Sequence, residues 1–431
     1  MTFWGLPLYI VLLHLFVLGS VVGSFLNVCI YRMPLHEKLF DQLRGLNSPP
    51  STCPRCGNRI RLRDNIPILG WLMRRGRCFN CQGKIAMRYP LIELMNGLLF
   101  VLVYWMEVPS SYYSTLEQSC LWADVGPTGN IGLWMLSPAA VANWRYVYHM
   151  VLIEGLVVAT FIDFDLRIIP DGSTVPAMII GVVGALVLGQ MFLVPVWIQD
   201  PGILRTIELI GPEWLPSMPQ LAYVPTWTRE HPHLHGLAVS LAGLIVGGGL
   251  VMAVRVMGQW VLKQEAMGFG DVVLMAMIGS FIGWQPTVIV FFLAPLCALV
   301  VVAACWLFRR GREIPYGPYL SLATLIVILG FKPIWARTEQ IFSLGILLPF
   351  FAIVSGAGFV FCLQMIQLTK RILGIPLYQE EWIDEWTSAD QLTFQSGERV
   401  DPKQGSWQRD EWPGINSGRG SSHEQRWRGG R

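Results

Sequence analysis

Long apolar runs recur along this chain and restrict it to folds that a lipid bilayer allows. The first run covers residues 6–30. Further runs, of which the one near 272 is short, begin near residues 91, 148, 175, 236, 272, 286, 315 and 341. About 20 apolar residues in a helix cross the hydrocarbon core of a membrane. Only 14% of the 431 residues are charged, against about a quarter in a typical soluble protein. The sequence therefore predicts an all-α polytopic membrane protein with about eight to nine transmembrane helices.

Positive charge is concentrated in residues 32–90, which carry twelve Lys and Arg residues against three acidic ones. Loops rich in Lys and Arg stay on the cytoplasmic side of a membrane. We therefore expect this loop in the cytoplasm, which puts the first residues of the chain outside. Nucleic-acid binding is the other use of a basic loop, but its place between two spans favours a topological role. We predict the bilayer as a partner and no nucleic acid.

Two CxxC pairs lie within this loop, and twenty-one residues separate them. Their members are Cys53, Cys56, Cys78 and Cys81. Four thiolates in two such pairs are typical of a tetrahedral zinc site of the zinc-ribbon type. Disulfides are the alternative, and a reducing cytoplasm disfavours them. We predict a cytoplasmic zinc-binding loop, in which the metal supplies folding energy that so polar a segment lacks.

Two acidic clusters lie where short polar turns meet apolar runs. They comprise Asp163, Asp165 and Asp171 in the first, and Asp271, which follows Gly268 and Gly270, in the second. Charged groups at the edge of a span are costly and are functional candidates by default. The alternation of spans puts Asp163 and Asp271 on the same side of the membrane. Two close carboxyls in a poorly hydrated site share a proton, as hydrolysis by an aspartyl pair requires.

For such a pair, the glycines around Phe269 would let the backbone turn sharply, so that Asp271 caps the next helix and faces inward. A less specific interpretation is that all these aspartates only cap helices and remain solvated. Glu93 lies at the start of the second run and has two equally plausible roles. Its negative charge can stabilise a helix N-terminus, or its side chain can line a site.

Six elements occur together and in a fixed order: GSFLNVCIYRMP, the two CxxC pairs, YPLIE, IDFDLRIIPD, EAMGFGD and IPYGPY. This set, spread over roughly residues 15–330, resembles the prepilin peptidase (type IV leader peptidase) family. The resemblance implies a polytopic intramembrane aspartyl protease of the GxGD type. Such enzymes cut basic leaders from prepilins or pseudopilins at the cytoplasmic face of the bacterial inner membrane. Many also methylate the new N-terminus with S-adenosylmethionine.

The resemblance implies roles for individual residues. Asp163 and Asp271 correspond by position to the two catalytic aspartates of the family. Supporting candidates are Asp165, Asp171, Gly268, Gly270 and Glu93. The cysteine loop, together with Glu93, resembles the part that the family associates with methyl transfer.

The expected organisation has four parts. Residues 1–108 hold the first spans and the cysteine loop (32–90), and residues 148–335 form the membrane aspartyl peptidase domain. Residues 336–371 add a C-terminal span, and 372–431, without apolar periodicity, form a disordered cytoplasmic tail.

The sequence departs from the family pattern at Val273, where the family often has Lys, and in its ninth span and charged tail. These departures leave the acids in place. Two alternatives stay open beside a peptidase that also methylates. One is a peptidase without methyltransferase activity, and the other is a catalytically silent membrane scaffold that binds pilins.

Overall fold

The structure is a computed structural model of the whole chain. It describes residues 7–36, 38–47, 52–53, 56–108, 138–210, 224–225, 227–262, 267–307, 315–373, 398–400 and 407–409.

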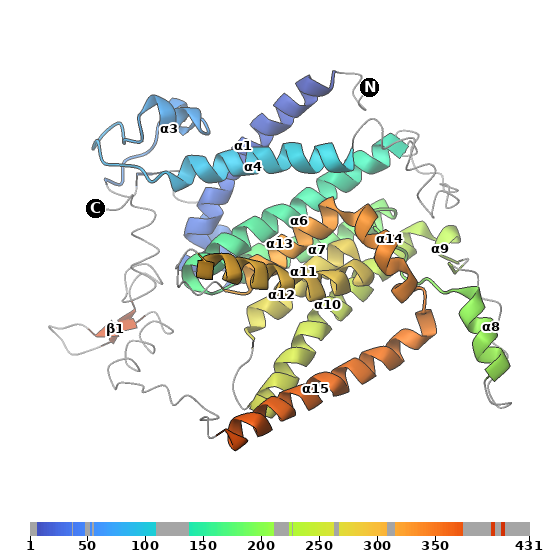
Figure 1. Cartoon of the computed structure of the whole chain (residues 1–431). Helices are drawn as coiled ribbons and strands as arrows, with labels where there is room; N and C mark the ends of the chain where they lie inside the picture. Colours follow the sequence, from blue (N-terminus) through green and yellow to red (C-terminus); the bar gives the residue numbers. More distant parts are fainter. Residues whose placement is uncertain are drawn as a thin grey trace.

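The described part of the chain is nearly all helical (Figure 1). Its long apolar helices are α1 (Leu8–Arg32), α4 (Arg88–Glu107), α6 (Pro138–Leu166), α7 (Asp171–Leu188), α10 (Pro232–Leu262), α12 (Trp284–Leu307) and α15 (Leu348–Ile372). Shorter helices are η1 (Met33–Leu35), α2 (Leu39–Asn47), η2 (Leu62–Asn65), α3 (Leu69–Met73), α8 (Pro201–Ile210), α9 (Trp227–Glu230), α11 (Phe269–Ile282), α13 (Gly317–Leu329), α14 (Phe331–Phe342) and η3 (Gly345–Leu347). The strands β1 (Glu398–Val400) and β2 (Trp407–Arg409) pair antiparallel.

The prediction of an all-α polytopic membrane protein is confirmed. Seven described helices are long and apolar enough to cross a membrane. The bent pair α13–α14, with a 95° angle at its break, would be an eighth span. The remaining apolar run is α11, which has only 14 residues. Each run seen in the sequence is therefore a helix, but the runs near 272 and 315 yield helices too short to cross a membrane by themselves.

One predicted boundary is wrong. The apolar run that begins near 175 continues to Ile198 in the sequence and predicts a helix of that length, but α7 ends at Leu188. Gly189 follows with φ +70° and ψ −42°, a backbone conformation that residues other than glycine rarely adopt. The next residues form an irregular segment, in which Val194 and Ile198 are fully buried against Trp335 and Phe342.

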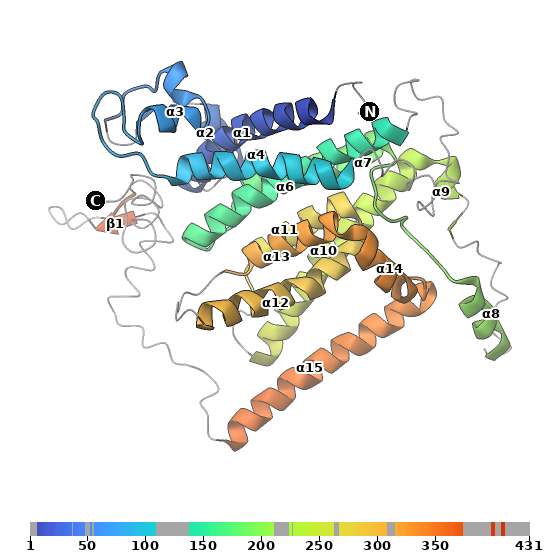
Figure 2. The same cartoon turned by 45° about the horizontal axis from the view of Figure 1, so that its top comes forward.

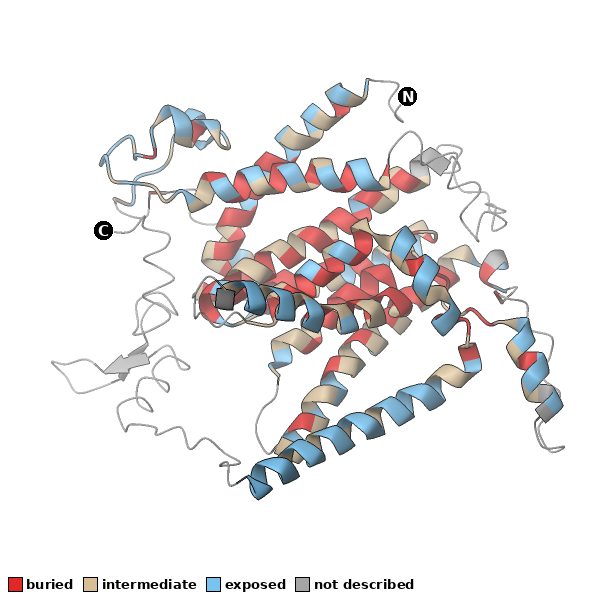
Figure 3. Cartoon of the chain, in the orientation of Figure 1, coloured by how far each residue is buried: buried red, intermediate tan, exposed pale blue. Residues whose placement is uncertain are grey.

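Helix α11 is the centre of the membrane bundle and packs against α6, α7, α10, α12 and α13. Its side chains from Leu274 to Ile282 are mostly buried (Figure 3). The α10 backbone reaches it closely, because Gly243 and Gly279 face each other with no room for a Cβ on either. A helix that is apolar all round belongs in a core. Because protein surrounds it, α11 does not have to match the thickness of the bilayer.

Two peripheral parts complete the described chain. The cysteine loop joins α1 to α4 and contains α2, η2 and α3, and Figure 2 shows it at one end of the α1–α4 pair. At the other edge of the bundle, α15 has no buried residue. Of the tail that was predicted to be disordered (372–431), the structure describes residues 372–373 at the end of α15 and the two short strands, and the rest lies outside the described residues.

Candidate functional site

Asp163 lies near the end of α6, and only 5% of its surface is exposed. Its backbone oxygen accepts a hydrogen bond from the Arg167 N–H at 2.8 Å. Arg167 has φ 57°, a left-handed conformation, and α6 ends at the residue before it, Leu166. The carboxylate of Asp163 is hydrogen-bonded to the backbone N–H of Gly317. This acid is thus held at a helix end and faces the start of α13.

Asp271 is the third residue of α11, and the expected role of its glycines is wrong. Gly268 is the N-cap and has φ −68°, which any residue can adopt, so no special turn requires glycine there. The Asp271 carboxylate accepts the N–H of Gly268. A side chain at this position that binds the N-cap N–H is half of a capping box. Asp271 therefore supports the helix start from the third position, and does not stand at the cap itself.

Asp163 and Asp271 come together beside Tyr316 and Gly317. The charge of Asp271 lies close enough to act on Asp163. Burial, and after it the negative charge of Asp271, raises the pKa of the Tyr316 phenol to about 12. A Cβ on Gly317 would lie 2.5 Å from Oδ2 of Asp163. Helices α6, α11 and α13 thus bring the two carboxyls to one place, and a side chain at position 317 would displace the Asp163 carboxylate from it.

Ile169 fills the space between the two glycine-containing turns. A Cβ on Gly270 would lie 3.0 Å from Cβ of Ile169, and a Cβ on Gly317 would lie 3.3 Å from its Cδ1. Ile169 belongs to the segment that follows Asp163. The three sequence elements IDFDLRIIPD, GFGD and PYGPY therefore meet at one side chain, and glycine at position 270 provides space, since the backbone there is helical. Val273, further along α11, is half-buried and brings no charge.

The other acids of the first cluster do not join this pair. Asp165 forms an ion pair with Arg88 at the start of α4, with Nη1 and Oδ2 2.8 Å apart and the Asp165 side chain fully buried. Asp171 is the first residue of α7 and is exposed. The next residue, Gly172, donates its N–H to Oε1 of Gln42 at 2.7 Å. Asp165 and Gln42 therefore link the cysteine-loop side of the protein to the segment that carries Asp163.

Glu93 lies one turn into α4 and binds the cysteine loop. Its Oε2 accepts the N–H of Ile68 at 2.7 Å, and its carboxylate also accepts the hydroxyl of Ser24 on α1. Ile68 has φ 59° and ψ −54°, and Leu69 N–H binds the Pro67 oxygen across it. This is a γ-turn of the rare, strained form. Glu93 thus holds a strained loop residue against the spans and is not a simple helix-end charge.

The four cysteine sulfurs form one cluster. All lie within 4.8 Å of one another, and the Sγ atoms of Cys53 and Cys81 are 3.9 Å apart. Four sulfurs bound to zinc at about 2.3 Å in a tetrahedron lie roughly 3.8 Å apart. A hydrogen bond from the Asn58 backbone N–H lowers the pKa of the Cys56 thiol to about 7, towards the thiolate that binds metals. The geometry fits a metal ion held by Cys53, Cys56, Cys78 and Cys81.

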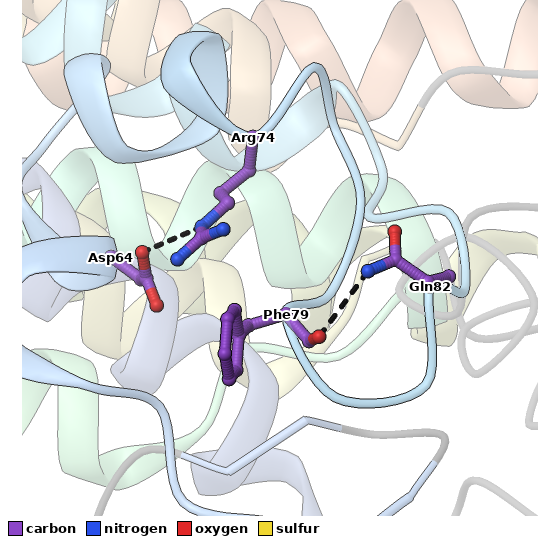
Figure 4. Close-up of polar contacts among 4 residues, drawn as sticks. All are labelled: Asp64, Arg74, Phe79 and Gln82. Atoms are coloured by element: carbon purple, nitrogen blue, oxygen red, sulfur yellow. Dashed lines mark hydrogen bonds and ion pairs between the residues drawn. The ribbon is translucent and has the colours of Figure 1, made fainter.

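The ring of Phe79, between the last two cysteines, lies under two guanidinium groups. Cζ of Arg61 is 3.5 Å and Cζ of Arg74 is 4.6 Å from its centroid. Arg74 also binds Oδ1 of Asp64 at 2.7 Å, and Gln82 donates to the Phe79 oxygen at 3.3 Å (Figure 4). Stacked cations of this kind stabilise a segment that has few apolar contacts.

A cavity of about 240 Å³ lies between this loop and the spans. Ser24, Asn27 and Glu93 contribute from α1 and α4, and the loop contributes Cys53 and Cys78. Aromatic and basic lining residues are Tyr31, Trp71, Phe79, Tyr89, Arg32, Arg59, Arg61, Arg74 and Arg77. The lining thus combines a buried carboxylate with guanidinium groups and aromatic rings.

Sequence reasoning placed the acids and the cysteines but missed several partners. In the sequence, Tyr316 and Gly317 belong to the IPYGPY element, and no local pattern links them to the acids. The contacts of Gln42 and Arg88 were not foreseen. Two local signals could have indicated these partners. Gly317 is followed by proline at the start of an apolar run, and Arg88 is a single Arg immediately before YPLIE.

Comparison with known proteins places these features in a family. Residues 17–107 match the bacterial peptidase A24 N-terminal domain, and residues 222–303 match the type IV leader peptidase family. The chain is 30% identical over 349 residues to a prepilin leader peptidase/N-methyltransferase of Aeromonas salmonicida, an alignment that covers 75% of this chain and 92% of that protein. The chain belongs to the type IV leader peptidase family.

Other members of the type IV leader peptidase family are similarly distant. The type 4 prepilin-like proteins leader peptide-processing enzyme of Escherichia coli O78:H11 is 29% identical over 322 residues, which cover 72% of this chain and 90% of that protein. A prepilin leader peptidase/N-methyltransferase of Myxococcus xanthus is 30% identical over 311 residues, covering 72% and 66%. The first matched domain contains the four cysteines and Glu93, and the second contains Asp271. No solved structure matches the chain.

The cysteine cluster yields a prediction about metal content. Cys81→Ser removes one of four ligands, and we expect it to lower the metal bound per chain at least about tenfold, because loss of a ligand leaves an incomplete site. Elemental analysis of the purified protein by mass spectrometry measures this. Cys362→Ser, an exposed cysteine on α15, is the matched control and should leave the metal content unchanged. Equal metal loss in both variants would contradict a metal site at the cluster.

Proposed function

We propose that the chain is an intramembrane aspartyl endopeptidase that removes the leader peptide from prepilins or pseudopilins. The observation that carries this proposal is the meeting of Asp163 and Asp271, from α6 and α11, beside Tyr316 and Gly317. Two carboxyls in a largely desolvated place, each also bound by a backbone N–H, form the arrangement that peptide hydrolysis by paired acids requires. The names of the relatives, which include prepilin leader peptidase, support the choice of substrate.

The pair would act by sharing one proton. One carboxylate takes a proton from water as the water oxygen attacks the scissile carbonyl carbon. The other, in its protonated form, donates a proton to the carbonyl oxygen, and the leaving amine later receives a proton from the pair. Because the two groups exchange these roles within a single catalytic cycle, neither Asp163 nor Asp271 is assigned a fixed one.

The placement of charge supports a cytoplasmic active site. Arg88 and Arg32 lie at the same end of the spans as Asp163, since Arg88 pairs with Asp165 and Arg32 binds the Gly45 oxygen in α2. Clustered arginines at one end of a bundle indicate the cytoplasmic face of a bacterial inner membrane. A substrate whose apolar segment stays in the bilayer would enter sideways, with its basic leader in the cytoplasm and its cleavage junction at the membrane edge.

We also infer that the cysteine-loop side carries methyl transfer to the new N-terminus. S-adenosylmethionine would supply the methyl group, and the cavity of about 240 Å³ beneath the loop has side chains suited to it. Glu93 offers a carboxylate to a positive charge, Arg32 and Arg77 offer guanidinium groups to a carboxylate, and Trp71 offers a ring to a base. Glu93 would hold the cationic part of the cofactor, and it also fixes the loop through Ile68.

Zinc is the metal that the cysteine cluster fits best, since four thiolates in a tetrahedral arrangement favour it over harder divalent ions. Its role in this proposal is structural. All four ligands are protein sulfurs, which leaves no open position for water or substrate. The metal would keep the loop folded, and the loop forms the wall of the cavity opposite α1 and α4.

Removing either acid tests the peptidase directly. We expect Asp163→Asn and Asp271→Asn each to lower precursor cleavage at least about a hundredfold, because an amide neither accepts nor donates the proton that the reaction moves. Mass spectrometry of a pilin-like precursor, incubated with the purified protein, measures the shortened product. Asp171→Asn changes an exposed acid nearby, and we expect it to retain cleavage within about twofold.

The same assay separates the alternatives. Substantial cleavage by Asp271→Asn would rule out the pair as the catalytic acids. An intact precursor with the unchanged protein, while an active relative cuts it in parallel, would favour the silent membrane scaffold.

Glu93 tests the second activity. Glu93→Gln keeps an oxygen that accepts the Ile68 N–H but removes the charge. We expect the methylated fraction of the product to fall at least about tenfold, since a cationic donor loses its buried partner, while cleavage persists. Mass spectrometry of one reaction with S-adenosylmethionine reads both products, so cleavage is the internal control. Equal loss of both activities, or no change in methylation, would contradict this role.

A further inference from the structure

The short helix α3 carries an apolar face that no other part of the described chain covers. Leu69, Leu72 and Met73 are 56%, 55% and 62% exposed. Their spacing of three and four residues puts them on one side of the helix. We call these three side chains the α3 apolar face. Unlike the exposed apolar residues of the spans, they belong to a polar, strongly basic loop (Figure 3).

The opposite side of α3 is fixed to the rest of the loop. Trp71 donates from Nε1 to the Ile85 oxygen at 3.2 Å, and its ring lies over Gly76. Gly70 is buried against the backbone of Asp64. Because Trp71 and Gly70 are held in this way, the α3 apolar face has a fixed direction, and the exposure of its side chains does not result from a loose loop.

The position of α3 relative to the spans places this face at the membrane boundary. Ile68, the residue before α3, donates its N–H to Glu93 at 2.7 Å. Glu93 lies five residues after Arg88, where α4 begins, which is roughly 7 Å along the helix axis. The start of α3 is thus level with the second turn of a membrane span. At that depth beside a span, lipid headgroups and the first acyl carbons surround the protein.

The charges around the face fit an acidic lipid surface. Arg63, Arg75 and Arg77 are exposed, as is Lys84. In residues 56–88 the one acidic side chain is Asp64, and it is bound to Arg74. An apolar face within a basic segment, lying beside a bilayer, is the composition of interfacial anchors that bind anionic lipid.

We infer that the α3 apolar face inserts into the leaflet beside α4, while the surrounding arginines bind acidic phospholipid headgroups. The loop would then be held at both sides, by Glu93 from the spans and by lipid from outside. Ser24 and Glu93 form part of the cavity wall that faces the loop, so this anchoring would keep the loop closed over the cavity. The inference concerns only where the loop sits and does not depend on which reaction the protein catalyses.

Site-specific photo-crosslinking in a bilayer tests this placement. The full-length protein, with p-benzoylphenylalanine in place of Leu72, is incorporated into nanodiscs of phosphatidylcholine or of phosphatidylcholine with phosphatidylglycerol. After illumination, mass spectrometry measures the lipid attached to the peptide that contains position 72. The matched control puts the same residue at Gln82, which is exposed and lies on the far side of Phe79 from Asp64 (Figure 4). Bound metal confirms that each variant keeps a folded loop.

We expect at least about tenfold more lipid adduct at position 72 than at position 82, because an inserted side chain is surrounded by acyl chains. We also expect the adduct at 72 to increase with phosphatidylglycerol, and Arg63→Glu to remove that increase. Adduct at 72 no greater than at 82, or adduct to a second protein chain in its place, would overturn the inference. Equal adduct in the two lipid mixtures would overturn the headgroup interaction.

Discussion

The contact between the Asp163 carboxylate and the backbone of Gly317 determines how three helices must meet. A Cβ at position 317 would lie 2.5 Å from Oδ2 of Asp163, so any side chain there would displace the carboxylate from its present position. Ile169 then fills the gap between Gly317 and Gly270, which brings the start of α11 beside the end of α6. The buried, all-apolar body of α11 keeps this junction in register, because its neighbours on every side are helices of the bundle. The acids are thus held by packing at some distance from them as well as by their own hydrogen bonds.

Polar contacts join the cysteine-loop side of the protein to this junction. Arg88 pairs with Asp165, two residues after Asp163, and Gln42 holds the start of α7. Deeper in the bundle, Asn96 of α4 donates to the Gly19 oxygen of α1 and to Glu154 of α6. Buried polar groups are costly unless they are paired, so each of these contacts specifies one arrangement of the helices. The two segments that match family domains, 17–107 and 222–303, are connected in this way through the residues between them.

The sequence predicts much of this arrangement where a local pattern carries the information. Apolar runs locate the helices, and the spacing of four cysteines predicts a metal cluster that the sulfur positions fit. The alternation of spans predicts that Asp163 and Asp271 share one side of the membrane. Contacts between distant segments were not predictable in this way. Two examples are the space that Gly270 leaves for Ile169 and the ion pair between Asp165 and Arg88, which are 77 residues apart. The strained turn at Ile68 likewise depends on a hydrogen bond to Glu93 from a separate helix. No pattern within a few residues encodes such contacts, since they form only when distant segments pack.

The proposed peptide hydrolysis depends most on Asp163 and Asp271 acting as one proton-sharing pair. The pH dependence of kcat/KM for precursor cleavage, measured in nanodiscs, tests that claim most directly. A shared proton requires the state with one carboxyl ionised and one protonated. At low pH both are protonated and no base remains, and at high pH both are ionised and no acid remains. We therefore predict a bell-shaped profile in which the rate falls on both sides. A rate that rises to a plateau and stays there at high pH, with the protein still folded, would contradict the pair.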